Sequence, residues 1–216
     1  MGGENDRWEY LVAGDAVCQL DDAVSSAAKG EVGIDGTAWT FVSDLFTGEP
    51  RENVVIVTDL LPHASQEVPI QALPPVAASP ELAELVKGYV PAVVKESCLS
   101  GNGAGFLAEM RLVTVLFITV PSLRFVSEES LTSAQRALML TLQVLSKFEG
   151  TLRQYLADDK GTVIIACFGL PPLAHENDSE FGIKAALELN TLLAEAGETF
   201  AIGVTTGDVF TGAVGR

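Results

Sequence analysis

The second half of the chain alternates between strand-like and helix-like patterns of apolar residues. Residues 111–120 form a short apolar run rich in β-branched side chains, which is typical of a buried strand, and residues 151–169 predict a pair of strands. Residues 133–150 and 176–197 repeat apolar positions at helical spacing. The glycine-rich segment 200–215 predicts a hairpin. This order of elements predicts an antiparallel sheet with helices on one face.

The first 61 residues show a shorter set of the same patterns. Residues 8–14 predict a strand, and residues 15–30 predict a helix with Asp15 and Gly30 at its ends. Residues 31–42 predict a strand followed by a turn or short helix. A second strand, apolar enough to be buried, is expected at 53–61.

A proline-rich segment separates these two blocks. Residues 62–80 contain five prolines, which remove amide donors and disfavour helix, so we expect a linker there. Residues 80–97 predict a short amphipathic helix broken by Pro91, and glycines at 100–105 predict a flexible joint. The predicted organisation is a block at 1–61, a linker at 62–108 and a second block at 109–216. Neither block looks complete, so we expect each to pack on the other or on further sequence.

The net charge of the chain limits the classes of molecule that it is expected to bind. The chain has 216 residues and a formal net charge of −16, which argues against nucleic acid and against an anionic membrane surface. The most apolar window, 106–126, is interrupted by charged residues and Pro121, so no membrane segment is expected. We expect an acidic, soluble, cytoplasmic protein.

No spacing predicts a metal site or a disulfide framework. The three cysteines are widely separated, without a CxxC motif, and Cys167 lies in an apolar run typical of a core. His63 and His175 have no second histidine or cysteine at ligand spacing. Asp158 and Asp159 fit a solvated turn between two strands better than a pair of ligands.

Four motifs together suggest a family. They are RLVTVLF at 111–117, DKGTVIIACFGLP at 159–171, IGVTTGDVFTGAVG at 202–215, and GYVPAVVKE at 88–96 in the linker. With these motifs the chain resembles a tandem class III nucleotidyl cyclase, and most of all the soluble, bicarbonate-responsive type of adenylyl cyclase. In that comparison the first block is the end of one cyclase domain and the second block is the start of the next.

The resemblance implies an α+β fold with two ferredoxin-like cyclase domains, both incomplete here. It implies that these domains pair within one chain and convert ATP to cyclic AMP, by attack of the ribose 3′-hydroxyl on the α-phosphate. It also implies two divalent ions, Mg²⁺ or Mn²⁺, held by two aspartates in the full-length protein. Thr119 and Thr162 stand at the matching positions, and a hydroxyl is a poor Mg²⁺ ligand. We therefore expect the metal ligands and the catalytic residues outside this chain, which is then inactive alone.

The resemblance also implies residues that contact the nucleotide. Gln154 stands where the family has a lysine that contacts the base, and Leu156 is expected on the same strand face. Leu11 and Val12 are expected to line the wall of the site. Asp21 stands where the bicarbonate-responsive type has an arginine, which argues against bicarbonate as the regulator. Gln154 as an ordinary strand residue stays an alternative, and so does GTP as the substrate.

Two other functions stay open. One is a degenerate cyclase-homology module that binds a nucleotide or a partner and serves regulation. The other is an unrelated ferredoxin-like interaction domain, which the order of the strands would distinguish.

Overall fold

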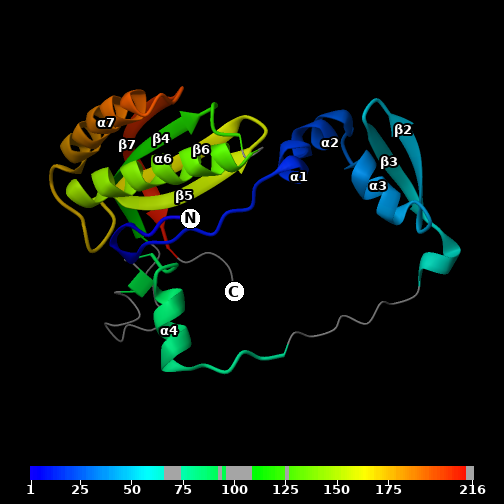
Figure 1. The fold of residues 1–216 in the computed structure, drawn as a ribbon, viewed down its shortest axis with the longest axis horizontal. Coiled ribbons are helices and arrows are strands. Elements are labelled where there is room, and N and C mark those ends of the chain that lie inside the picture. Colours follow the sequence, from blue (N-terminus) through cyan, green and yellow to red (C-terminus); the bar gives the residue numbers. More distant parts are fainter. Residues whose placement is uncertain (66–73, 92–93, 96–108, 125–126, 213–216) are drawn as a thin grey trace. The chain divides into compact units, whose positions relative to one another are not determined.

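The computed structural model describes residues 1–65, 74–91, 94–95, 109–124 and 127–212 (Figure 1). Backbone contacts divide the chain into two compact units. One unit is Ala13–Ala77, and the other combines Met1–Val12 with Ala78–Arg216. The predicted joint at 100–105 and Cys98 lie outside the described residues. The boundaries at residues 61 and 108 stay a prediction.

The larger unit is built on a four-stranded antiparallel sheet with strand order β5-β6-β4-β7. Helices α6 and α7 lie side by side and cover the same face of this sheet (Figure 1). This arrangement confirms the predicted antiparallel sheet with helices on one face. The bounds are β4 Glu109–Val120, α6 Glu128–Lys147, β5 Thr151–Asp158, β6 Gly161–Phe168, α7 Asp178–Glu195 and β7 Ala201–Thr211.

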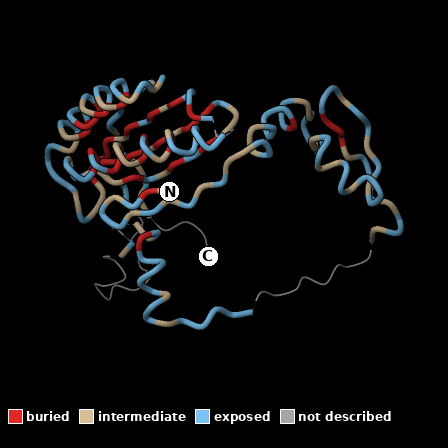
Figure 2. Tube along the Cα trace, viewed as in Figure 1, coloured by how far each residue is buried: buried red, intermediate tan, exposed pale blue. Residues whose placement is uncertain are grey.

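The core of this unit lies between the sheet and the two helices, where buried residues gather in Figure 2. Leu116 and Ile164 of the sheet, Leu138 of α6 and Leu189 of α7 are all fully buried. Burial of such side chains stabilises a fold by roughly 1.5–3 kcal/mol each. We call the sheet face that carries this core the helix face, and the opposite one the open face.

The predicted hairpin at 200–215 has no turn within 201–211, because these residues form one continuous strand, and its residues 213–215 lie outside the described part of the chain. Strand β7 pairs with β4 from Ala201 opposite Thr119 to Thr211 opposite Glu109. The length of β4 offers hydrogen bonds along the whole of β7. Gly203 and Gly207 lie inside the strand, and neither has the positive φ that a tight hairpin turn requires.

The strand predicted at 8–14 is wrong. The chain folds back on itself here, with a hydrogen bond from Glu9 N to the Met1 carbonyl (2.7 Å) and a short 3-10 turn, η1, at Glu4–Asp6. Nε2 of Gln135 on α6 donates to the Gly2 carbonyl over 2.7 Å, and Gly2 N donates to its Oε1 over 2.9 Å. The backbone of residues 1–9 therefore pairs with itself, with Gln135 of α6 and with the Gly88 carbonyl, not with a sheet edge.

Helix α4, Pro80–Lys87, lies in the described part of the linker region. Ser79 caps it by accepting a hydrogen bond from Leu82 N, and proline stands at its first position. The helix ends before Pro91, where the sequence predicts a break. A 3-10 turn, η2 Pro62–Ser65, opens the proline-rich segment.

The smaller unit has a three-stranded antiparallel sheet of order β1-β3-β2 with short helices. Its core is small and consists of Ala23, Val54 and Ile56, with Ala27 packed against them. The helix predicted at 15–30 is two helices, and β2 is a strand that the sequence pattern does not predict. The bounds are α1 Asp15–Cys18, α2 Leu20–Ser26, β1 Val32–Asp35, α3 Gly36–Val42, β2 Phe46–Arg51 and β3 Val54–Leu60.

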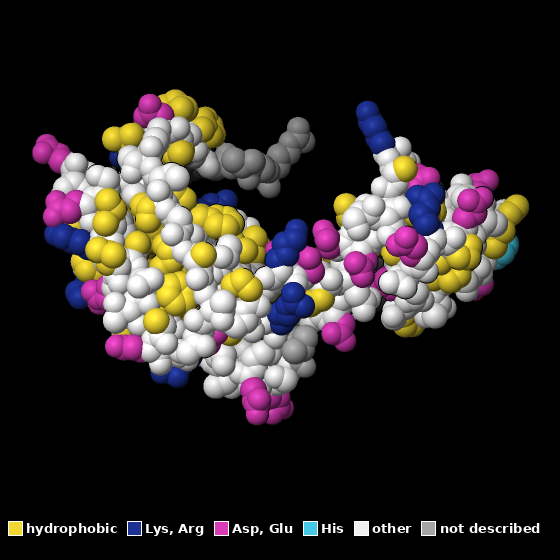
Figure 3. Space-filling model, turned by 90° about the horizontal axis from the view of Figure 1, so that it is seen from above, with side chains coloured by type: hydrophobic (Ala, Val, Ile, Leu, Met, Phe, Trp, Pro, Cys, Tyr) yellow, Lys and Arg dark blue, Asp and Glu magenta, His cyan; other side chains and the backbone are white. Residues whose placement is uncertain are grey.

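Acidic side chains are scattered over the surface shown in Figure 3, with apolar side chains between them. On α7, for example, Ile183 and Leu187 are 52% and 64% exposed. Among the helices of the described segments, none combines the length and the apolar character needed to cross a membrane.

Candidate functional site

The open face of the four-stranded sheet holds the residues that the sequence singles out on β5. The ladder aligns its side chains in rows across the strands, because residues paired across antiparallel strands point to the same face. One row runs from Gly203 through Phe117 and Ile165 to Gln154. The next row runs from Ala201 through Thr119 and Val163 to Leu156.

Gln154 and Leu156 are thus neighbours on one uncovered strand face. Leu156 is 42% exposed, and Gln154 is half-buried. Tyr155 between them points the other way: its hydroxyl donates to the Ala134 carbonyl of α6 over 3.2 Å, and burial raises the pKa of this phenol. An amide beside an apolar side chain can bind a flat heterocycle, because it offers both a donor and an acceptor.

A β-bulge precedes Gln154, and no sequence pattern signals it. Leu152 pairs with Ala166 of β6, and Gln154 pairs with Ile165, so Arg153 has no partner in the ladder. Nearby, Cys167 is buried, which raises the pKa of its thiol, while the Arg153 guanidinium acts in the opposite direction. The sequence analysis did not select Arg153 as a site residue.

Thr119 and Thr162, the positions matched to metal-binding aspartates, lie on opposite faces of the sheet. Thr119 is half-buried on the open face. Thr162 pairs with Val120 on the helix face, is 1% exposed, and donates a hydrogen bond to the Leu123 carbonyl. No group of three or more metal-ligating side chains occurs within the described ranges. These residues therefore do not fit a divalent ion.

The residues predicted from the first block belong to segments that are distant from β5 in the sequence and have no strand pairing with it. Leu11 and Val12 belong to an extended segment without strand pairing, and Val12 is 60% exposed. Asp21 is an exposed residue of α2. Of the four predicted nucleotide contacts, the structure brings together Gln154 and Leu156.

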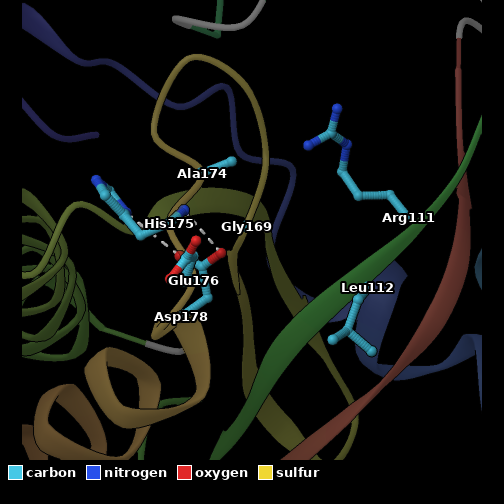
Figure 4. Close-up of a pocket in the computed structure, with 7 residues that line it drawn as sticks. All are labelled: Arg111, Leu112, Gly169, Ala174, His175, Glu176 and Asp178. Carbon is cyan, nitrogen blue, oxygen red and sulfur yellow. Dashed lines mark hydrogen bonds and ion pairs between the residues drawn. The ribbon is translucent and has the colours of Figure 1, made fainter.

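An open hollow of about 430 Å³ lies at the other end of β4 from Thr119 (Figure 4). Arg111 comes from the strand, and His175 and Asp178 come from the segment that enters α7. Nε2 of His175 lies 2.7 Å from a carboxylate oxygen of Glu149, and its Nδ1 lies 3.4 Å from one of Asp178. Arg111 pairs with Glu109 over 2.6 Å. The lining of this hollow thus holds one arginine, Arg111, and two acidic residues, Glu176 and Asp178.

Comparisons with known proteins agree with the fold. No family model matches the chain. Adenylate cyclase type 10 of Rattus norvegicus is 27% identical over 142 residues, which is 64% of this chain and 9% of that protein. The Homo sapiens protein of the same name is 28% identical over 143 residues, 63% of this chain and 9% of that protein. The chain thus spans about a tenth of the length of these relatives.

A solved structure has a similar fold. It is a bacterial light-regulated adenylyl cyclase, with a TM-score of 0.52 and 15% sequence identity. The match covers 63% of this chain and 41% of that one. At this identity the match supports the fold alone, and it confirms the predicted α+β, ferredoxin-like architecture. The chain is thus similar in sequence to adenylate cyclase type 10 over 64% of its length, and similar in fold to a bacterial adenylyl cyclase.

Proposed function

We propose that this chain is part of an adenylyl cyclase that converts ATP to cyclic AMP and pyrophosphate in intracellular signalling. The observation that carries the proposal is the open face of the sheet, where Gln154 and Leu156 lie side by side. The likeness to adenylate cyclase type 10 supports the choice of reaction. We further propose that the full-length protein acts in the cytoplasm.

In this proposal the chain binds the nucleotide and supplies no reacting group. Adenine presents a ring nitrogen acceptor beside an amino donor, and the amide of Gln154 matches that pattern. Leu156 packs on the face of the base and excludes water from one side. A second cyclase domain of the same chain pairs with the open face and completes the site.

Mg²⁺ or Mn²⁺ is part of the proposal for the full-length protein. Thr119 and Thr162 do not fit such an ion, so its ligands are proposed on residues outside this chain. The chain alone is accordingly expected to be inactive.

Cyclase activity of the full-length protein tests the proposal, with ATP against GTP and with Mg²⁺ against Mn²⁺. We expect cyclic AMP from ATP, and a several-fold higher KM for ATP in Gln154→Ala. Lys184→Ala is the matched control, because Lys184 is exposed on α7 and pairs with Glu180 away from the open face.

A degenerate cyclase-homology module is the second candidate. The buried, hydrogen-bonded position of Thr162 favours it, because that position is occupied by a structural contact. If the full-length protein forms no product with either nucleotide and either metal, the enzyme proposal is wrong and the binding module is the better proposal.

A further inference from the structure

The bulge in β5 changes what the open face presents beside Gln154. Thr151 pairs with Cys167 on the open face and Leu152 pairs with Ala166 on the helix face. Alternation along the strand then directs Arg153 to the open face. Gln154 lies on the same face, because the bulge makes it pair with Ile165 of the open face. Without the bulge it would pair with Ile164 of the helix face. Two consecutive side chains therefore lie on one face.

The surroundings of Arg153 agree with this placement. Its guanidinium lies close enough to Cys167, an open-face residue, to act on the pKa of that thiol. Arg153 is exposed, and it makes no hydrogen bond or ion pair with any other residue that the structure describes. A guanidinium has five N–H donors and no acceptor, and it stays charged at neutral pH. Arg153 is thus a free cationic donor beside the amide of Gln154.

We propose that Arg153 contacts the purine base together with Gln154 and strengthens the binding of ATP. This inference rests on the proposed function. Arg153 would donate to the ring nitrogen of adenine while the Gln154 carbonyl oxygen accepts from the amino group. The bulge thereby supplies a positive charge one residue before Gln154, which itself is neutral.

The position of Arg153 favours the base over the phosphates as its ligand. Leu156 and Thr119 share one row of the open face, and Gln154 lies in the next row. Arg153 lies on the other side of Gln154 from Leu156. In the proposed function Gln154 and Leu156 contact the base, so Arg153, next to Gln154, is at the base end of the bound nucleotide.

Arg153 and Gln154 together also predict how each residue affects the choice between ATP and GTP. Guanine presents two acceptors where adenine presents an acceptor and a donor. The amide of Gln154 can turn and offer its NH2 group to the second acceptor, so Gln154 accommodates either purine, whereas the donors of Arg153 alone match guanine better. Removing the amide with Gln154→Leu should therefore move the selectivity toward GTP.

The test measures kcat and KM for ATP and GTP in the full-length protein, and ATP binding directly by calorimetry. The variants are Arg153→Met, Arg153→Lys and the double variant Arg153→Met/Gln154→Lys. We expect Arg153→Met to raise KM for ATP about tenfold, in the range that one well-placed contact to a base contributes. The change in kcat should stay within about threefold, because the contact is made in both the bound and the reacting state.

Rescue separates base contact from a structural role. The double variant moves the positive charge by one residue and should restore most of the ATP affinity. Arg153→Lys keeps the charge and should lose less than Arg153→Met. Arg136→Met is the matched control, because Arg136 is exposed on α6 at the opposite face, and its KM should equal that of the wild type.

Two outcomes overturn the inference in different ways. If the wild type forms cyclic AMP and Arg153→Met leaves both KM for ATP and the preference over GTP unchanged, Arg153 does not contact the base and the proposed function stands. If the wild type neither binds ATP nor forms product, both proposals are wrong.

Discussion

Thr162 and Leu123 are joined by a buried hydrogen bond: Oγ1 of Thr162 donates to the carbonyl oxygen of Leu123 over 3.0 Å. The two residues are 1% and 2% exposed. This contact fixes the segment after β4 against the start of β6, so position 162 has a structural role.

We predict that Thr162→Asp destabilises the larger unit and creates no metal site. A carboxylate at this position is buried without a compensating cation, which typically costs about 3–5 kcal/mol. Thr162→Val should cost about 1 kcal/mol through the lost hydrogen bond. Urea unfolding of the chain measures both changes. A stable Thr162→Asp variant that binds Mg²⁺ would contradict this prediction.

Thr119→Asp is the comparison for this experiment. Thr119 is half-buried on the open face, where a carboxylate keeps access to water. We expect a change below about 1 kcal/mol in the free energy of unfolding, as for most substitutions away from the core.

The elements of the larger unit follow from patterns of apolar residues, and the exceptions have physical causes. The β-branched run at 111–120 and the helical spacing at 133–150 predict β4 and α6. The glycines of β7 suggest turns, but their partner β4 is long enough to keep the strand extended. Pairing with a strand that is distant in the sequence therefore determines the conformation of β7, and the local sequence pattern of β7 does not reveal that pairing.

The candidate site is predicted in part for the same reason. A spacing of two residues predicts that Gln154 and Leu156 share a face, and the register places them so. The bulge at Arg153 depends on how β5 aligns with β6, which the sequence of β5 alone does not specify. Similarly, strand β2 contains Gly48 and Pro50, which disfavour strand, and forms because β3 offers it a ladder.

We predict that Gly182→Ala destabilises the larger unit because α7 lies too close to β4 for a side chain. A β-carbon at Gly182 would lie 2.7 Å from Cγ2 of Thr114 and 3.4 Å from Cδ1 of Leu116. Overpacking of this kind costs typically about 1–3 kcal/mol. The thermal unfolding midpoint of the chain should therefore fall.

Gly207→Ala is the matched control for this change. Gly207 lies in β7, and a β-carbon there has no heavy atom within 4 Å. We expect an unchanged or slightly higher midpoint, since alanine reduces the conformational freedom of the unfolded chain. Equal effects of the two substitutions would show that the close approach at Gly182 does not limit packing.

Alanine substitution at Leu156 is predicted to affect KM for ATP, whereas alanine substitution at Leu152 is predicted to affect stability. Leu156 is 42% exposed on the open face, so Leu156→Ala should change stability by less than about 1 kcal/mol while raising KM for ATP in the full-length protein. Leu152 is 5% exposed on the helix face, so Leu152→Ala should cost about 2–5 kcal/mol. Chemical unfolding and enzyme kinetics on both variants check this. An unchanged KM in Leu156→Ala would remove Leu156 from the proposed base site.

Glu31 and Arg51 form a two-pronged ion pair that makes the smaller unit sensitive to acid. The distances are 2.5 Å from Nη1 to Oε2 and 3.0 Å from Nη2 to Oε1. The hydrogen bond from Arg51, together with one from Ala28 N, lowers the pKa of the Glu31 carboxyl to about 2 from its ordinary value of 4.5. Because the pKa is depressed in the folded state, the stabilisation is fully present above pH 4.5 and is lost as the pH falls toward 2.

An NMR titration of the Glu31 side-chain carbonyl carbon measures this pKa directly. We expect a midpoint near 2 in the wild type and a clear upward shift in Arg51→Met, which keeps only the bond from Ala28 N. The stability lost in Arg51→Met should be larger at pH 7 than at pH 2, because protonation of Glu31 breaks the pair in the wild type as well. The pair is exposed, so salt should reduce the difference. A midpoint that does not move in Arg51→Met would show that Arg51 does not hold the carboxylate in solution.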